Sequence, residues 1–241
     1  MQSINAILLF AHILAGSVAL LSGPVAMLTP KGGKQHRRWG NVYYASMAVI
    51  FVTALFMALY KDIPFLLMIA VLSFYLVVSG HRAPALKQLH RGQKAGRGDW
   101  LFTLTSLAFS LGLLAWGGYQ WLAGDTLGIA AVVLGALGTV NTSLQIRKFV
   151  IPPEDKNHWL YAHVGGMAGG YIATVTAFMV VTLTFIPDPW PWIIPSVLGV
   201  PMIRGWQYNY KKKQEQKADE RLLKKKLAQK KEPFRKAQLA K

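Results

Sequence analysis

The stretch INAILLFAHILAGSVALLSGPVAMLTPKGGKQHRR, residues 4–38, decides the fold class. It begins with an apolar run, Ile4–Met27, and ends with four basic residues between Lys31 and Arg38. About 20 apolar residues in helical conformation cross the hydrocarbon core of a bilayer. The run lacks a basic leader and an Ala-x-Ala cleavage site, so it predicts a retained transmembrane helix rather than a signal peptide.

Similar apolar runs recur along the whole chain. Of its 241 residues, 53% are hydrophobic and only 15% are charged, and the mean hydropathy is +0.30. This composition predicts an all-α, polytopic transmembrane bundle of seven helices in one domain. The absence of cysteine excludes disulfides and thiolate chemistry. The seven predicted spans are Ile4–Met27, Asn41–Tyr60, Ile63–Ser79, Trp100–Leu122, Thr126–Gln145, Trp159–Ile186 and Trp190–Ile203.

The last predicted span is short and rich in proline, and Pro201 is expected to kink or unwind it. The sequence therefore divides into a transmembrane domain, 1–206, and a basic tail, 207–241. From Gly205 onward the chain has 13 Lys and Arg against 4 Asp and Glu. This segment has too few apolar residues for a core, so a disordered segment or a short surface helix is expected.

The basic residues alternate between the loops. The loops after the first, third and fifth predicted spans are rich in Lys and Arg, and the other loops are not. Because Lys and Arg gather on the cytoplasmic side, the N-terminus is predicted outside and the C-terminus inside, in the inner membrane of a bacterium. Six spans would leave the basic tail outside, so this rule favours the seventh.

Histidine is, apart from tyrosine, the only titratable residue type near the predicted hydrocarbon core, because no Lys, Arg, Asp or Glu falls inside a span. His36, His81 and His163 are all expected at the cytoplasmic face. Ionisable residues in membranes are costly and are functional candidates for that reason. Asn141 lies at the same predicted depth, whereas His12 lies alone in the outer half of the first span and is a secondary candidate.

Three strings of the sequence resemble a known family. The strings AHILAGSVALLSGPVAML and HRRWGNVYYASM, and later HVGGMAGGYIATVTAF, are similar to the bacterial predicted-membrane-protein family called domain of unknown function 2306. The likeness runs from about His12 to Phe178. The resemblance implies a multi-helix membrane fold and brings no reaction or ligand with it.

The first functional interpretation is a haem b site for membrane electron transfer. Haem in a helix bundle needs two axial ligands on facing helices, usually His with His or Met. The histidines at the cytoplasmic face supply candidates, Met167 is a secondary one, and Gly166 leaves room for a flat group. Arg37 and Arg82 are expected to meet the propionates. More commonly, however, closely spaced glycines such as those in HVGGMAGGYIATVTAF let two membrane helices pack together.

Two other interpretations stay open. The same three histidines, His36, His81 and His163, are a familiar ligand set for zinc or another divalent metal, which would suit a hydrolase at the membrane interface. No carboxylate base lies nearby in the spans. Otherwise the protein is a small transporter or membrane scaffold, and the histidines only bond backbone carbonyls at helix ends.

The tail and the basic stretch at residues 31–38 have simpler explanations. The stretch is a topology signal, with Trp39, Tyr43 and Tyr44 as an aromatic interface anchor. The tail is expected to contact anionic lipid headgroups of the bilayer. Nucleic acid is the less favoured partner, because the tail has neither interleaved aromatic residues nor a recognition module.

Overall fold

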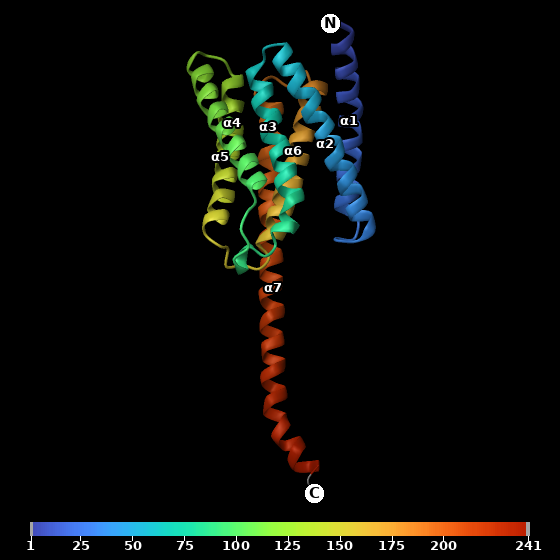
Figure 1. Ribbon diagram of the computed structural model, residues 1–241, viewed down its shortest axis with the longest axis vertical. Coiled ribbons are helices and arrows are strands. Elements are labelled where there is room, and N and C mark those ends of the chain that lie inside the picture. Colours follow the sequence, from blue (N-terminus) through green and yellow to red (C-terminus); the bar gives the residue numbers. More distant parts are fainter. Residues whose placement is uncertain (1, 240–241) are drawn as a thin grey trace. The chain divides into compact units, whose positions relative to one another are not determined.

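The computed structural model describes residues 2–239, and these form an all-helical protein (Figure 1). No β-strand occurs in this range. The seven-helix fold class predicted from the sequence is confirmed. In chain order the helices are α1 (Gln2–Leu28), α2 (Lys34–Tyr60), α3 (Pro64–Arg82), the short 3-10 helices η1 (Ala83–Leu86) and η2 (Leu89–Arg91), α4 (Arg97–Leu122), α5 (Leu127–Val150), α6 (His158–Thr182) and α7 (Trp190–Leu239).

Six of these helices are long and apolar enough to cross a membrane, counted over the described residues. They are α1 to α6, which match the first six predicted spans. α7 is not among them. Its apolar part before Arg204 rises only about 20 Å along the helix axis, whereas the hydrocarbon core is about 30 Å thick.

Several helix ends differ from the predicted ones. α2 begins at Lys34 instead of Asn41, because Lys, Gln and Arg are good helix formers and continue the helix beyond its apolar part. α6 ends at Thr182 instead of Ile186. The backbone of α7 is helical through to Leu239, and residues 240–241 lie outside the described range.

The chain divides into two compact units, Met1–Val200 and Pro201–Lys241. In the first unit, α1 pairs with α2, α4 pairs with α5, and α3 lies centrally, in contact with α2, α4 and α6 (Figure 1). One core cluster joins α1, α2 and α3 through Ala19, Tyr43, Met47 and Val77. A second cluster joins α3, α4 and α5 around Leu113.

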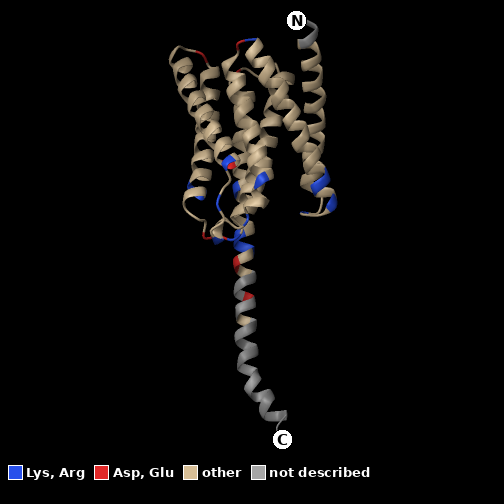
Figure 2. Cartoon of the chain, viewed as in Figure 1, with Lys and Arg blue, Asp and Glu red and all other residues tan. Residues whose placement is uncertain are grey.

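The helix connections alternate between the two ends of the first unit. The turns at 29–33, 83–96 and 151–157 meet at one end, which we call the basic end. Lys and Arg of this unit gather there, and among them only Lys61 lies at the other end (Figure 2). The alternation of charge seen in the sequence is thus a separation in space.

Candidate functional site

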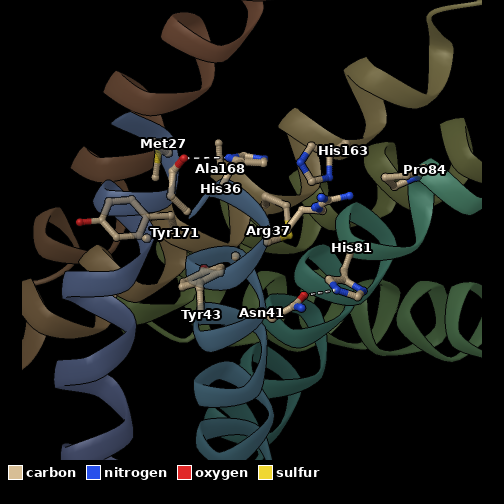
Figure 3. Close-up of a pocket in the computed structure, with 14 residues that line it drawn as sticks. Met27, His36, Arg37, Asn41, Tyr43, His81, Pro84, His163, Ala168 and Tyr171 are labelled. Atoms are coloured by element: carbon tan, nitrogen blue, oxygen red, sulfur yellow. Dashed lines mark hydrogen bonds between the residues drawn. The ribbon is translucent and has the colours of Figure 1, made fainter. Parts of the chain in front are cut away.

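A cavity of about 250 Å3 lies near the basic end, between α1, α2, α3, η1 and α6 (Figure 3). It is the candidate functional site. Its lining is mostly apolar, with a few polar side chains. The lining residues are Gly23, Ala26, Met27, His36, Arg37, Gly40, Asn41, Tyr43, His81, Pro84, His163, Met167, Ala168 and Tyr171.

His36 is placed by the turn between α1 and α2. It lies in the first turn of α2, which follows the extended backbone of Gly33. Its Nδ1 lies 2.8 Å from the carbonyl oxygen of Ala26 on α1. A carbonyl can only accept a hydrogen bond, so Nδ1 carries the proton, and Nε2 of the neutral ring has a lone pair.

His163 is placed by the crossing of α3 and α6. Its Nδ1 donates to the carbonyl oxygen of Gly80 at 2.9 Å. The two backbones approach so closely there that a Cβ on Gly166 would lie 2.5 Å from the carbonyl oxygen of Leu76. This crossing brings the Gly80 carbonyl within reach of the imidazole one turn before Gly166. Again Nε2 is left with the lone pair.

The imidazoles of His36 and His163 are neighbours across the cavity. Their ring centres are 6.0 Å apart and their planes are inclined by 67°. Both rings are half-buried. Two imidazoles from different helices, each held by a backbone carbonyl, therefore lie side by side. The interpretation as a transporter or scaffold without a cofactor also expects each ring to bond a backbone carbonyl. That interpretation gives no partner to the Nε2 atom of either ring.

His81 lines the same cavity but is held differently. Its Nε2 lies 3.2 Å from Oδ1 of Asn41 on α2. The ring also stacks on Tyr44, with 4.3 Å between ring centres and 30° between planes. Its side chain is exposed. His81 therefore links α3 to α2 beside the pair formed by His36 and His163.

The charge around the cavity is positive. Arg37 contributes to the lining, and no Asp or Glu does. Lys31 donates to the carbonyl oxygen of Met27, and partial burial lowers the pKa of Lys31 from its usual value. The charge of Lys31 also acts on His163. An anionic group is the ligand type that this environment favours.

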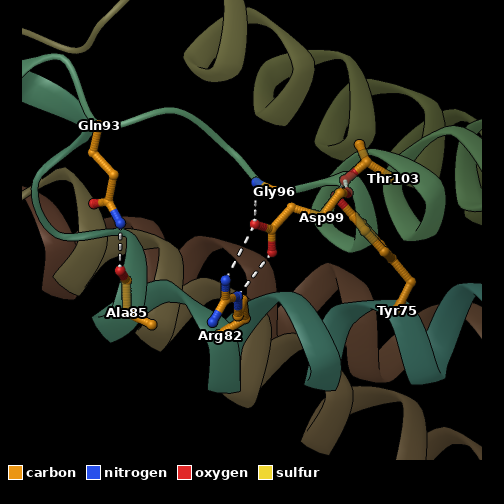
Figure 4. A network of polar contacts seen from close by, with 7 residues as sticks. All are labelled: Tyr75, Arg82, Ala85, Gln93, Gly96, Asp99 and Thr103. Carbon is orange, nitrogen blue, oxygen red and sulfur yellow. Dashed lines mark hydrogen bonds and ion pairs between the residues drawn. The ribbon is translucent and has the colours of Figure 1, made fainter.

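The structure brings together some of the residues proposed from the sequence and separates others. His36, His81, His163, Arg37 and Met167 line the cavity. The guanidinium of Arg82 instead pairs with Asp99 at the start of α4, at 2.9 Å (Figure 4). Gly166 packs against Gly80 and does not face the cavity.

The two remaining secondary candidates also lie elsewhere. His12 bonds through Nδ1 to Oγ1 of Thr53 on α2 at 2.9 Å. This is the helix-to-helix hydrogen bond that a lone histidine in a span most often makes. Asn141 belongs to α5, which contributes no residue to the lining.

Asn41, Tyr43 and Tyr171 line the cavity and were not proposed from the sequence. Helical periodicity was the available signal. His36, Gly40 and Tyr43 follow one another at i, i+4 and i+7, and on α6 the spacing from His163 to Tyr171 also returns to one face. The sequence predicts the second span from Asn41 onward, which places His36 just before that span and outside this helical face.

The arrangement offers two ligand atoms rather than three. Among the described residues, no group of three or more His, Cys, Asp or Glu side chains lies close enough together to hold a metal ion. The three histidines are therefore not arranged as a zinc triad. What the geometry provides is a pair of neighbouring imidazoles, arranged edge to face, in a positively charged, largely apolar cavity.

The fold and composition define a polytopic, all-α integral membrane protein. Residues 9–151 match a family described as "Predicted membrane protein (DUF2306)", and the chain belongs to this family. The match includes His36 and His81 and ends before His163, so it is shorter than the likeness inferred from the sequence. No curated protein and no solved structure matches the chain.

Proposed function

We propose that the cavity binds haem b between His36 and His163 and that the protein carries electrons in the membrane. The observation that carries the proposal is the pair of neighbouring imidazoles, each of which donates Nδ1–H to a backbone carbonyl. Ligating histidines typically donate a hydrogen bond from the N–H of their other ring nitrogen in this way, which orients the ring and raises its basicity.

The spacing of the two rings supports this assignment. An imidazole nitrogen binds a metal at about 2 Å, so two axial imidazoles place their ring centres about 6 Å apart. The 6.0 Å between His36 and His163 agrees with this separation. The angle between the planes is free, because each ring can turn about its own bond to the metal.

The surroundings suit an amphipathic anion. The apolar lining suits a macrocycle, while Arg37 and Lys31 can pair with propionates. A cavity of about 250 Å3 is smaller than a haem. Binding therefore requires α1 and α6 to separate, and their contact includes Gly23 against Tyr171 and a 3.3 Å hydrogen bond from Tyr171 Oη to the carbonyl of Leu20.

Electron transfer is the chemistry that this ligand set favours. His36 and His163 would both hold the haem iron, and a haem held by two histidines would supply one-electron exchange. A zinc hydrolase is less well supported, because the lining supplies no carboxylate base. A bare metal ion on two imidazoles and a transporter or scaffold without cofactor remain as outcomes of the test.

The test is the visible spectrum of the full-length protein purified in mild detergent, before and after reduction with dithionite, with elemental analysis for iron, zinc and copper. We expect stoichiometric iron and a spectrum that sharpens on reduction. Alanine at His36 or His163 should abolish both, and His12→Ala is the matched control outside the cavity. Zinc or copper without a haem spectrum would favour the bare ion. Neither metal nor haem in protein from haem-replete cells would overturn the proposal.

We infer that the basic end faces the cytoplasm and that the protein lies in the inner membrane of a bacterium. The support is the separation of charge between the two ends of the first unit (Figure 2). A reporter inserted at Gly124 should then be external, and one fused after Lys241 should be cytoplasmic provided that α7, although its apolar part is short, also crosses the membrane. The opposite result at both positions would reverse the topology.

We propose anionic lipid as the partner of the basic tail. The tail carries a net charge of +9 from Gly205 onward, and Lys211, Lys212 and Lys213 are exposed. Each basic residue near an anionic surface contributes about 1 kcal/mol. A peptide of residues 207–241 should therefore bind phosphatidylglycerol vesicles and should not bind phosphatidylcholine vesicles. Its binding to phosphatidylglycerol should weaken at high salt, because salt screens the attraction. Equal binding to both would contradict the proposal.

A further inference from the structure

A second pair of histidines lies outside the cavity. His90 belongs to η2, and His158 is the first residue of α6. Their ring centres are 5.9 Å apart, with planes inclined by 58°. Neither residue lines the cavity. The pair joins the connection between α3 and α4 to the start of α6.

The ring of His158 is buried with one nitrogen unused. The residue is 5% exposed, and its Nε2 is buried without a hydrogen-bond partner. Buried polar atoms nearly always have a partner, since leaving one unpaired costs free energy. The site is therefore incomplete without a further atom beside Nε2.

Both rings are oriented by one backbone segment. His90 Nδ1 donates to the carbonyl oxygen of Lys87 at 2.9 Å, and the ring of His158 also interacts with the backbone of Lys87. With Nδ1 engaged, the neutral ring of His90 has its lone pair on Nε2. Imidazoles held by a carbonyl through one nitrogen commonly ligate a metal through the other.

The nearby charges are mixed. Asp155 and Lys148 both act electrostatically on His158. Asp155 Oδ1 already accepts a hydrogen bond from the backbone N–H of Asn157 at 2.8 Å. Among the described residues no third metal ligand joins the pair. A metal bound there would have two protein ligands, with water in its remaining positions.

We propose that His90 and His158 bind one divalent transition-metal ion of the class that prefers imidazole, such as Cu2+ or Zn2+. Two imidazoles at neighbouring positions of one ion place their ring centres about 4.5 to 5 Å apart, so the two rings, now 5.9 Å apart, need to close by roughly 1 Å to share an ion. The ion is the missing partner of His158 Nε2. By binding both histidines, it links the connection that contains η2 to the first turn of α6.

The experiment uses the full-length protein, stripped with a chelator, and Cu2+ as the probe. Titration followed by electron paramagnetic resonance should show a site with nitrogen coupling that the His36 and His163 variants retain. His90→Ala and His158→Gln should each weaken this site at least about tenfold, while His36→Ala and His163→Ala leave it unchanged. His158→Gln keeps a polar side chain in the buried position, and His90 is only half-buried, so a folding defect in one variant leaves the other informative.

A second measurement follows the same site without copper spectroscopy. Trypsin cleaves after Lys and Arg, and Lys87, Arg91 and Lys94 lie in this connection. Zn2+ should slow cleavage there in the wild type and not in His90→Ala. Equal copper affinity in the wild type and both variants would overturn the proposal. So would loss of the site in the His36 variant alone, or Zn2+ protection that survives His90→Ala.

Discussion

The crossing of α3 with α6 and the pairing of α4 with α5 use the same packing device with different results. In both, glycines let two backbones touch. A Cβ on Gly80 would lie 2.6 Å from the backbone nitrogen of Met167, and one on Gly135 would lie 2.6 Å from that of Leu114. Yet only the α3–α6 crossing has a histidine one turn away.

The difference shows that close packing by itself makes no site. Between α4 and α5 the buried polar side chains are hydroxyls. Ser110 and Thr142, for example, return their hydrogen bonds to carbonyls of their own helices. At the α3–α6 crossing, the hydrogen bond of His163 instead goes to the other helix. A side chain that can titrate or ligate is held in a fixed place only in the second case.

The largest effect that tests this comparison should come from a large residue at the two glycine contacts. Gly166→Leu and Gly135→Leu should both lower thermal stability in detergent, by roughly 1–3 kcal/mol or more, because backbone faces the new side chain. Only Gly166→Leu should also remove cavity ligand, since it moves His163 away from His36. Circular dichroism on heating measures the first effect and the visible spectrum the second. A normal spectrum in Gly166→Leu would break the comparison.

The helix pattern was predictable because it depends on local composition. Apolar length and loop charge predicted where six membrane helices lie. The side-by-side placement of His36 and His163 depends on which helices pack together, and the shared depth of the histidines supported it only as a hypothesis. Arg82 illustrates the limit, since basic residues next to a predicted site suggested a ligand contact. Its partner, Asp99, follows from the packing of α3 against α4, which no local pattern specifies.

A smaller effect is expected at the link between the two regions. Asp99 accepts from Arg82 on α3 and from the backbone N–H of Gly96 at 2.8 Å, which caps α4 (Figure 4). Asp99→Asn keeps an amide oxygen that can accept the Gly96 N–H, so it removes mainly the charge pair with half-exposed Arg82 and should lower the free energy of unfolding by about 0.5–1 kcal/mol. The cavity should be unaffected.

Asp125→Asn is the matched control for Asp99→Asn. Asp125 accepts from the backbone N–H of Leu127 at 2.9 Å, and the described contacts give it no ion pair. The difference in unfolding free energy between the two variants isolates the ion pair. A change in the cavity spectrum of Asp99→Asn would mean that the α4–α5 region and the cavity are coupled.

A still smaller effect is expected at His12, which also makes a hydrogen bond between helices. His12→Ala should cost about 0.6 kcal/mol, the average for such bonds in membranes, and leave the cavity spectrum unchanged. A double-mutant cycle with Thr53→Val measures the bond itself. If His12→Ala also removed the spectrum, the distinction between a packing histidine and a ligand histidine would fail.

The smallest effect should come from a hydroxyl within the α4–α5 pairing. Thr142 is fully buried, and its Oγ1 donates to the carbonyl of Gly138 at 2.9 Å, within its own helix. That carbonyl is in the interior of α5, where it accepts a helical hydrogen bond, so Thr142→Val leaves no backbone group without a partner. We expect a change below about 0.5 kcal/mol.

Thr103→Val is the informative contrast, because Thr103 Oγ1 accepts from Tyr75 Oη of α3 at 3.4 Å. Its loss leaves a buried phenol unpaired and should cost about 1 kcal/mol or more. Equal effects in the two variants would mean that a hydroxyl bonded within its own helix stabilises the protein as much as one shared between helices, and the comparison between the two regions would lose its physical basis.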